Sequence, residues 1–274
     1  MGCVRLGGLA RNLIEAYMAK VISKPLSVRE QVSAEEWQIR VDLAAAYRLV
    51  HHYGWTDMIF THLSARVPGP EHHFLINPYG MMFDEVTASD LVKIDLDGNI
   101  VMDTEWQVNP AGFCIHSAIH MARSDAKAVM HLHTDDGVAV SSMAEGFLPL
   151  TQTALVIHDQ VANHEFEGVA LDLDERQRLV ADIGDKQLLL LRNHGTLATG
   201  ETVSECFLNL YTFERACTMQ VRAMASNRLH MPSEQAVETA RQQGETLMKT
   251  GGLEALAWPA LLRMLDRNYP GFRE

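Results

Sequence analysis

The first regular pattern of hydrophobic and polar positions predicts an amphipathic helix that begins near residue 34. Ser33-Ala34-Glu35-Glu36 has the form of a capping box, in which a hydroxyl and a carboxylate satisfy the first free amides of a helix. Apolar residues then recur at helical spacing until Gly54, which ends the helix. The apolar face of this predicted helix comprises Trp37, Val41, Ala44, Ala45 and Leu49.

Short strand patterns follow this helix in two pairs. Residues 59–67 and 73–76 flank a Pro-Gly-Pro loop, and this arrangement predicts a hairpin. Residues 91–95 and 100–103 flank Asp-Gly-Asn, whose turn chemistry predicts a second pair of strands.

The second half of the chain alternates between helical and strand patterns. Helices are predicted over 113–123, 135–143, 174–183 and 202–225, and strands over 128–133, 149–159 and 187–191. From residue 227 the chain is polar, and a short tail helix ending at Asp266 then presents an apolar stripe of Trp258, Leu261, Leu262 and Leu265. We expect an N-terminal leader or arm (1–32), one domain (33–226), and a helical tail (227–274) that packs on that domain or on a neighbouring subunit.

The strand that ends in His-x-His carries the chemistry. Side chains of a strand alternate between its faces, so His131 and His133 point one way and Leu132 the other. Two imidazoles on one face can share a metal ion, but two hydrogen-bonded structural histidines explain the motif equally well.

A third histidine favours the metal. His194 follows the apolar strand 187–191 and precedes Gly195, which lets the backbone turn sharply in a crowded place. Three imidazoles from two strand ends match a catalytic zinc-type site with a position left for water or substrate. We therefore expect Zn²⁺ at His131, His133 and His194, and the donor set also permits Mn²⁺ or Fe²⁺.

Composition narrows the classes of partner and compartment. The 274 residues carry a formal net charge of −12, which argues against a nucleic-acid backbone or an anionic membrane surface as partner. No stretch approaches the roughly 18 apolar residues of a transmembrane helix. Four cysteines without a CxxC pair indicate neither a disulfide framework nor a thiolate zinc site, so we expect a cytoplasmic protein.

Two long segments resemble the class II aldolase and adducin family. They are HSAIHMARSDAKAVMHLHT (His116–Thr134) and LLLLRNHGTLATGETVSECF (Leu188–Phe207), and the likeness extends over about 33–225. The resemblance implies a three-layer α/β/α domain with a mostly antiparallel central sheet, assembled as a homotetramer with active sites at subunit interfaces. It also maps the family's metal ligands onto His131, His133 and His194. The segments at 54–67 and 76–98 and the tail at 261–266 look closest to the adducin head.

Two departures from the family's sugar-phosphate aldolases bear on function. Their acidic metal ligand and proton carrier corresponds to Gly112, so the acid is missing here. Their phosphate-binding pairs correspond to Thr61-His62, Tyr79-Gly80 and Pro110-Ala111, which retain little phosphate-binding chemistry. Adducin, a spectrin and actin partner without known catalysis, has lost the same acid.

Other residues near the expected site offer a replacement for the acid. His116 lies one helical turn beyond Gly112 on the same face, where it would ligate the metal or hydrogen-bond a ligand; we favour the hydrogen bond. Tyr79 and Glu85 lie in a loop that the resemblance places near the cleft. His120, a further turn along the helix, would line the pocket or be a partly exposed surface histidine; we favour the surface position. A carboxylate introduced at Gly112 is expected to face the metal.

These observations predict a metal-dependent lyase that acts on a small non-phosphorylated hydroxy- or oxo-acid or carbonyl compound, by retro-aldol cleavage or decarboxylation. The main alternative is a non-catalytic binding and oligomerisation module like the adducin head, and an iron-dependent oxygenase on the same fold is a further one. The short tail after Asp266 differs from adducin's basic partner-binding tail and favours the small-molecule interpretation.

Overall fold

The computed structural model describes residues 26–168, 174–226, 228–249 and 252–274. The chain divides into two units, Met1–Ala34 and Glu35–Glu274. The described part of the first unit contains the short helix α2 (Val28–Gln31), and most of the expected N-terminal arm lies outside the described residues. The second unit holds the sheet, the apolar cores and the candidate site.

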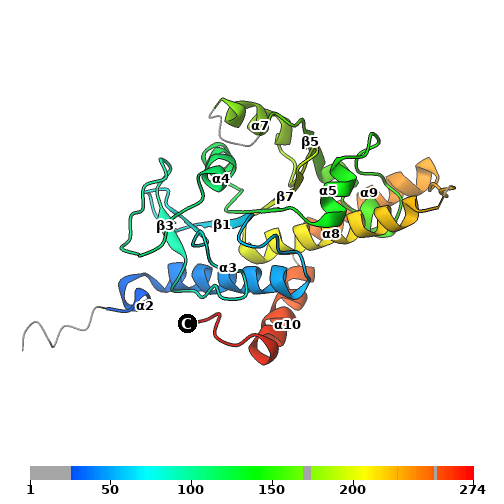
Figure 1. Ribbon diagram of the computed structural model, residues 1–274. Coiled ribbons are helices and arrows are strands. Elements are labelled where there is room, and N and C mark those ends of the chain that lie inside the picture. Colours follow the sequence, from blue (N-terminus) through cyan, green and yellow to red (C-terminus); the bar gives the residue numbers. More distant parts are fainter. Residues whose placement is uncertain (1–25, 169–173, 227, 250–251) are drawn as a thin grey trace, which may run out of the picture. The chain divides into compact units, whose positions relative to one another are not determined.

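A seven-stranded sheet forms the centre of the second unit, with the strand order β3-β2-β1-β4-β7-β6-β5. Every strand pair is antiparallel except β5 with β6. Figure 1 shows the sheet between its helices. The strands are β1 (His62–Arg66), β2 (Phe74–Ile76), β3 (Val92–Ile94), β4 (Ala128–Leu132), β5 (Val161–His164), β6 (Leu188–Leu191) and β7 (Gly195–Gly200).

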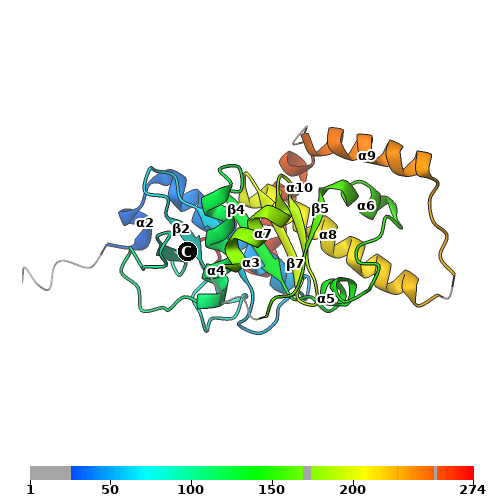
Figure 2. The same cartoon turned by 90° about the horizontal axis from the view of Figure 1, so that it is seen from above.

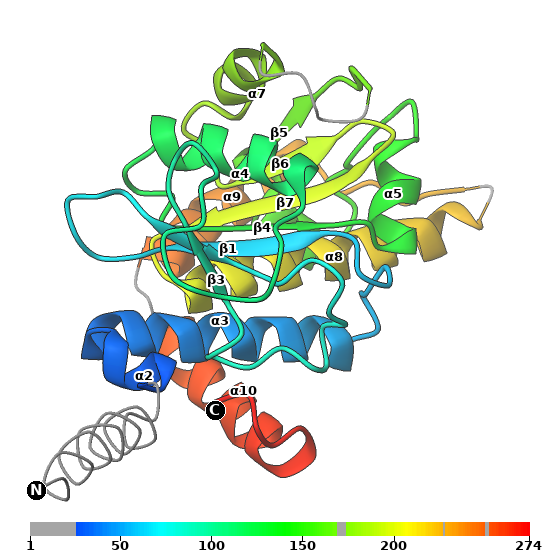
Figure 3. The same ribbon diagram turned by 60° about the vertical axis from the view of Figure 1, so that its left-hand side comes forward.

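Helices cover both faces of the sheet, as Figure 3 shows. On one face lie α3 (Ala34–His52) and α8 (Val203–Met224), and on the other lie α4 (Pro110–Ala122) and α7 (Glu175–Ile183). Each strand sends alternate side chains to the two faces, so apolar side chains pack against both faces of the sheet. The expected three-layer α/β/α fold with a mostly antiparallel sheet is confirmed.

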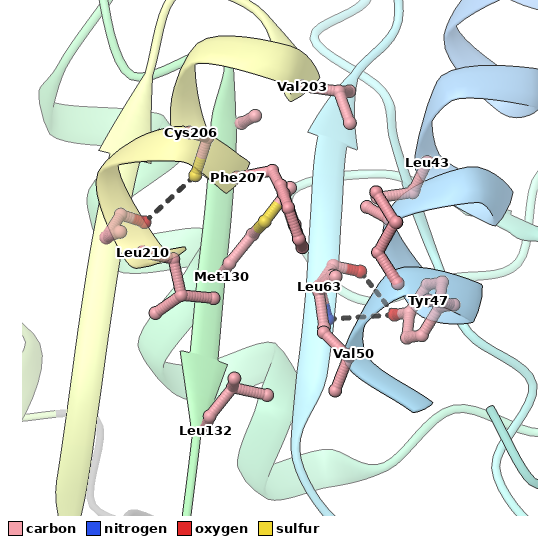
Figure 4. Packing of buried hydrophobic residues seen from close by; sticks show 14 of the residues in the cluster. Leu43, Tyr47, Val50, Leu63, Met130, Leu132, Val203, Cys206, Phe207 and Leu210 are labelled. Atoms are coloured by element: carbon pink, nitrogen blue, oxygen red, sulfur yellow. Dashed lines mark hydrogen bonds between the residues drawn. The ribbon is translucent and has the colours of Figure 1, made fainter. Parts of the chain in front are cut away.

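The core on the α3 and α8 face is shown in Figure 4. Leu63 of β1 and Met130 of β4 are fully buried between Tyr47 of α3 and Phe207 of α8. Burial of each such side chain contributes about 2 kcal/mol. The Tyr47 hydroxyl also donates to the Leu63 carbonyl at 2.5 Å and accepts from the Leu63 amide at 2.8 Å, which fixes α3 against the strand that carries His62.

Several sequence-based predictions are confirmed, and others are wrong. The hairpin β1–β2 and the helices α3, α4, α7 and α8 form where the patterns place them. The strand predicted over 149–159 is instead the helix α6 (Gln152–Leu155) followed by a 3₁₀ turn (His158–Gln160), because the Thr151 side chain caps a helix there. Residues 100–103 form only an isolated bridge, Ile94 with Ile100.

The remaining helices are α5 (Asp135–Ser141), α9 (Glu234–Lys249) and α10 (Gly252–Asn268). Figure 2 shows α9 beside α6. In α10, the Trp258 indole donates to Asp42 of α3 at 3.1 Å, and Leu265 is fully buried. The apolar stripe of the tail is therefore largely buried against other residues of its own chain. Among the described residues, no helix has the length and apolar character needed to cross a membrane.

Candidate metal centre

The end of β4 and the turn between β6 and β7 bring three histidines together. His131 is the fourth residue of β4 and His133 follows the strand, while His194 lies in the turn that joins two antiparallel neighbours. A Cβ at Gly195 would lie 2.3 Å from the Leu132 carbonyl oxygen. Only glycine allows this approach, and the approach sets His194 beside His133.

The three imidazoles converge on one point. Their ring centroids lie 4.7 Å (His131 to His133), 4.7 Å (His131 to His194) and 4.9 Å (His133 to His194) apart. One nitrogen from each ring lies within 4.8 Å of the other two, and within the described ranges no other three histidine, cysteine or carboxylate groups meet in this way. The arrangement can hold one metal ion with three protein ligands.

Hydrogen bonds to Nδ1 of His131 and of His133 orient the lone pair on each Nε2 toward the centre of the cluster. Nδ1 of His131 lies 2.9 Å from the Thr196 carbonyl and Nδ1 of His133 lies 3.2 Å from an Asp57 carboxylate oxygen, so each Nδ1 donates. In a neutral ring the proton on Nδ1 leaves a lone pair on Nε2. The two Nε2 atoms face each other at 2.9 Å, an arrangement that a cation between them stabilises.

Burial keeps the rings of His131 and His194 neutral. The pKa of His131 is lowered well below its usual value by burial and then by His194 and His133. Burial, followed by the neighbouring His133, lowers the pKa of His194 to about 4. Neutral imidazole is the form that binds a metal, so these two ligands need no deprotonation near pH 7.

A chain of buried hydrogen bonds ends beside the three histidines His131, His133 and His194, which we call the triad. The Ala126 carbonyl accepts from His120 Nδ1 at 2.9 Å, so His120 Nε2 accepts from the Ser64 hydroxyl at 2.8 Å. The Ser64 oxygen accepts from His116 Nδ1 at 2.6 Å, and His116 Nε2 accepts from His62 Nδ1 at 3.1 Å. These directions leave a lone pair on Nε2 of His62, whose ring centroid lies 5.5 Å from that of His131.

This chain changes the expected role of His116 and corrects that of His120. Both nitrogens of His116 are engaged inside the protein, so no nitrogen is left to ligate a metal as a fourth ligand. His116 instead holds His62, which stands nearer the triad. His120 was expected at the surface, but it is 1% exposed and hydrogen-bonded at both nitrogens.

His62 also occupies the space expected for a side chain at position 112. A Cβ built on Gly112 would lie 2.3 Å from His62 Cδ2 and 2.7 Å from His62 Nε2. A carboxylate at Gly112 would therefore have to displace the imidazole before it faced the triad. The pKa of His62 is lowered to about 3 by burial and then by His133 and His194.

The other sequence-based candidates lie in loops at this end of the molecule. Tyr79 follows β2, its backbone pairs with Gln107, and its ring is partly exposed. Among the described residues, its hydroxyl makes no hydrogen bond to the triad. Glu85 accepts from the Met82 amide at 2.9 Å. Thr61, next to His62, is buried in a left-handed conformation with φ of 67°, and its hydroxyl has no hydrogen-bond partner within the part of the chain that the structure describes.

Sequence reasoning assigned no role in the site to Asp57 or Glu214, and it noted His62 only at the position of a phosphate-binding pair of the family. Asp57 and His62 belong to the loop after α3 and the start of β1, far from His131 in sequence. His62 becomes its neighbour through the pairing of β1 with β4, which sets His62 opposite His131. The signal available in the sequence was a histidine within the predicted hairpin strand 59–67.

Comparison with known proteins gives a consistent family match. The family described as "Class II Aldolase and Adducin N-terminal domain" matches residues 41–221. A relative from Caulobacter vibrioides, named "Putative aldolase class 2 protein", is 57% identical over 91% of this chain and 97% of its own. Alpha-adducin of Mus musculus is 38% identical over 86% of this chain, a match that spans 35% of the adducin.

Solved structures show the same fold. An aldolase II superfamily protein from Pseudomonas syringae has a TM-score of 0.86 and 49% identity, covering 91% of this chain and all of that one. An L-fuculose 1-phosphate aldolase from Glaciozyma antarctica has a TM-score of 0.74 and 26% identity, covering 86% of this chain and 93% of that one.

Proposed function

Because the chain belongs to the class II aldolase and adducin family, we propose that it is a divalent-metal-dependent carbon–carbon lyase. Its proposed substrate is a small, non-phosphorylated hydroxy- or oxo-acid or carbonyl compound, cleaved by retro-aldol reaction or decarboxylation. The observation that carries the proposal is the convergence of three imidazoles, in which Nε2 of His131 and Nε2 of His133 lie 2.9 Å apart and a nitrogen of His194 lies within 4.8 Å of both rings' ligand atoms.

The proposed roles follow from the contacts. His131, His133 and His194 would hold the ion, and the Thr196 carbonyl and the Asp57 carboxylate keep two of these rings in the ligating tautomer. A bound divalent ion supplies Lewis-acid polarisation of a substrate oxygen. Zinc suits three neutral imidazoles, and the same donors accept Mn²⁺ or Fe²⁺.

His62 and His116 take the place of the missing carboxylate in this proposal. His116 fixes the proton on Nδ1 of His62, so His62 Nε2 is a hydrogen-bond acceptor for a substrate hydroxyl. Tyr79, in the loop after β2, stays a candidate proton donor to the substrate. His116 acts only through its hydrogen bond to His62. A phosphorylated sugar is a poor candidate because Thr61-His62 and Tyr79-Gly80 add no cationic side chain to bind a phosphate.

Metal analysis tests the metal assignment. Protein purified without chelator should carry one equivalent of divalent metal per chain, and alanine at His131, His133 or His194 should abolish stoichiometric binding. His120→Ala is the matched control, since it removes a buried histidine outside the triad. A triad variant that keeps a full, tightly bound equivalent would exclude that histidine as a ligand.

Turnover assays separate the lyase from its main alternative. The 38% identity to alpha-adducin supports a second candidate, an adducin-head-like binding module on the same fold. The metal-loaded protein should release an aldehyde, an oxo-acid or CO₂ from at least one member of a hydroxy- and oxo-acid panel, and the triad variants should not. Metal binding without turnover on the panel would favour the binding module.

The assembly and the compartment belong to the same proposal. Class II aldolases often form oligomers, and exposed apolar side chains gather in the loops around the site: Met58, Phe60, Tyr79 and Met82. We propose a homotetramer on this basis. The thiols of Cys206 and Cys217 are free and buried, which fits a reducing cytoplasm.

A further inference from the structure

Glu214 is a buried carboxylate on the sheet face opposite His62 and His116. It lies in α8 and is 1% exposed. Among the described residues no cationic side chain pairs with it, whereas the buried Glu36 of α3 is paired with both Arg40 and Lys93. An uncompensated buried carboxylate costs stability, so a role in packing alone does not explain it.

The two oxygens of Glu214 hold the two segments that carry the metal-site histidines. Oε2 accepts from the Thr134 hydroxyl at 2.5 Å, and Oε1 accepts from the Thr196 hydroxyl. Thr134 directly follows His133. Thr196 comes two residues after His194, and its carbonyl accepts the hydrogen bond from His131 Nδ1.

Close packing leaves these contacts little freedom. The Thr134 hydroxyl caps α5 by accepting from the Gly137 amide at 2.9 Å. A Cβ on Gly137 would lie 2.7 Å from the Thr134 hydroxyl oxygen and 3.2 Å from Glu214 Oε2. Only glycine fits at this position, so α5 packs directly against the Glu214 carboxylate. This close packing keeps water away from the carboxylate.

We propose that Glu214 is a positioning residue of the metal centre, which fixes the spacing of His133 and His194 through Thr134 and Thr196 and places a negative charge behind the ion. The inference rests on the proposed metal site. Its physical basis is that three neutral imidazoles leave the charge of a dication uncompensated, and a buried anion attached to the ligand segments offsets part of it. Burial raises the pKa of Glu214 to about 7, so a nearby dication would favour its ionised form.

Glu214→Gln keeps the shape of the side chain and removes its charge. We expect metal affinity, measured by competition with a chelator, to fall about 10- to 100-fold, the usual effect of removing a group that supports a ligand. The visible absorption spectrum of the cobalt-substituted protein should change as well, because it reports ligand geometry. Thr196→Val removes only one hydroxyl and should move both readouts in the same direction, which keeps the test decisive if Glu214→Gln folds poorly.

Asn209→Ala is the matched control. Asn209 also lies in α8 and also ties it to β7, by donating to the Thr199 carbonyl at 3.0 Å, but at the end of the strand away from the histidines. The Asn209→Ala variant should unfold at a lower urea concentration, while its metal affinity and its cobalt absorption spectrum stay unchanged. Wild-type affinity and spectrum in both Glu214→Gln and Thr196→Val, or an equal change in Asn209→Ala, would overturn the inference. A wild-type protein that binds no metal would instead overturn the proposed function, and this inference with it.

Discussion

A single methyl group added at Gly112 should collide with the imidazole of His62. Gly112 is the third residue of α4, and its φ is not in the left-handed region. The added Cβ of Gly112→Ala would lie 2.3 Å from Cδ2, 2.7 Å from Cγ and 2.7 Å from Nε2 of His62. The substitution therefore tests whether His62 fills the space that a side chain from α4 would otherwise occupy.

Two effects of opposite sign decide the outcome. Alanine favours a helix over glycine by about 1 kcal/mol, which would stabilise the variant. Overpacking in a close-packed interior costs about 1–3 kcal/mol. His62 has little room to yield, because its backbone pairs with His131 and its ring is hydrogen-bonded to His116. We expect the collision to win, with a net loss of about 1 kcal/mol.

Urea unfolding of the chelator-treated protein measures this loss, and a double-mutant cycle assigns its cause. In a His62→Ala background the three close contacts disappear, so Gly112→Ala should become neutral or stabilising. The coupling free energy between the two substitutions should be about 1–3 kcal/mol. A stabilised Gly112→Ala in the wild-type background, or a coupling energy near zero, would refute the placement of His62.

Two further predictions concern pH and assembly. Burial lowers the pKa of five histidines, which are His62, His116, His120, His131 and His194. Below pH 6.5 these histidines bind more protons in the unfolded chain, whereas Glu214, with its raised pKa, binds more in the folded chain. Because five histidines outweigh one carboxylate, stability falls as pH falls. Urea midpoints of the metal-free protein should therefore drop between pH 6.5 and 5, and a flat profile would contradict the burial of these rings. In analytical ultracentrifugation at micromolar concentration we expect a tetramer. A monomer would refute the proposed assembly and leave the exposed Met58 and Phe60 unexplained.

Features encoded locally were predictable from the sequence. The capped helix α8 follows from Thr202 and its apolar periodicity, and the shared face of His131 and His133 follows from strand alternation. Hairpin β1–β2 follows from its turn residues. In each case the relevant residues lie within a few positions of one another, so pattern and propensity suffice.

Other elements were hidden because tertiary packing overrides weak local signals. β7 (Gly195–Gly200) is a buried strand of small residues between β4 and β6, and its sequence Gly-Thr-Leu-Ala-Thr-Gly lacks a strong strand signature. The apolar segment before Asp159 resembles a strand by composition, but the cap at Thr151 makes part of it helical. For the tail stripe at Trp258 and Leu265 the sequence left open its own domain or a neighbouring subunit, and both residues pack within their own chain.

The surroundings of the three histidines separate what the sequence determines locally from what depends on tertiary structure. The sequence by itself determined the ligand candidates, since His-x-His and His-Gly are local motifs. It did not determine that β1 pairs with β4 in the register that sets His62 beside His131, or that Gly112 leaves room for that ring. Nor did it show that Glu214 reaches Thr134 and Thr196 from α8. Strand register and helix packing depend on contacts between distant segments, and a buried polar group is explained only by the partner that those contacts provide.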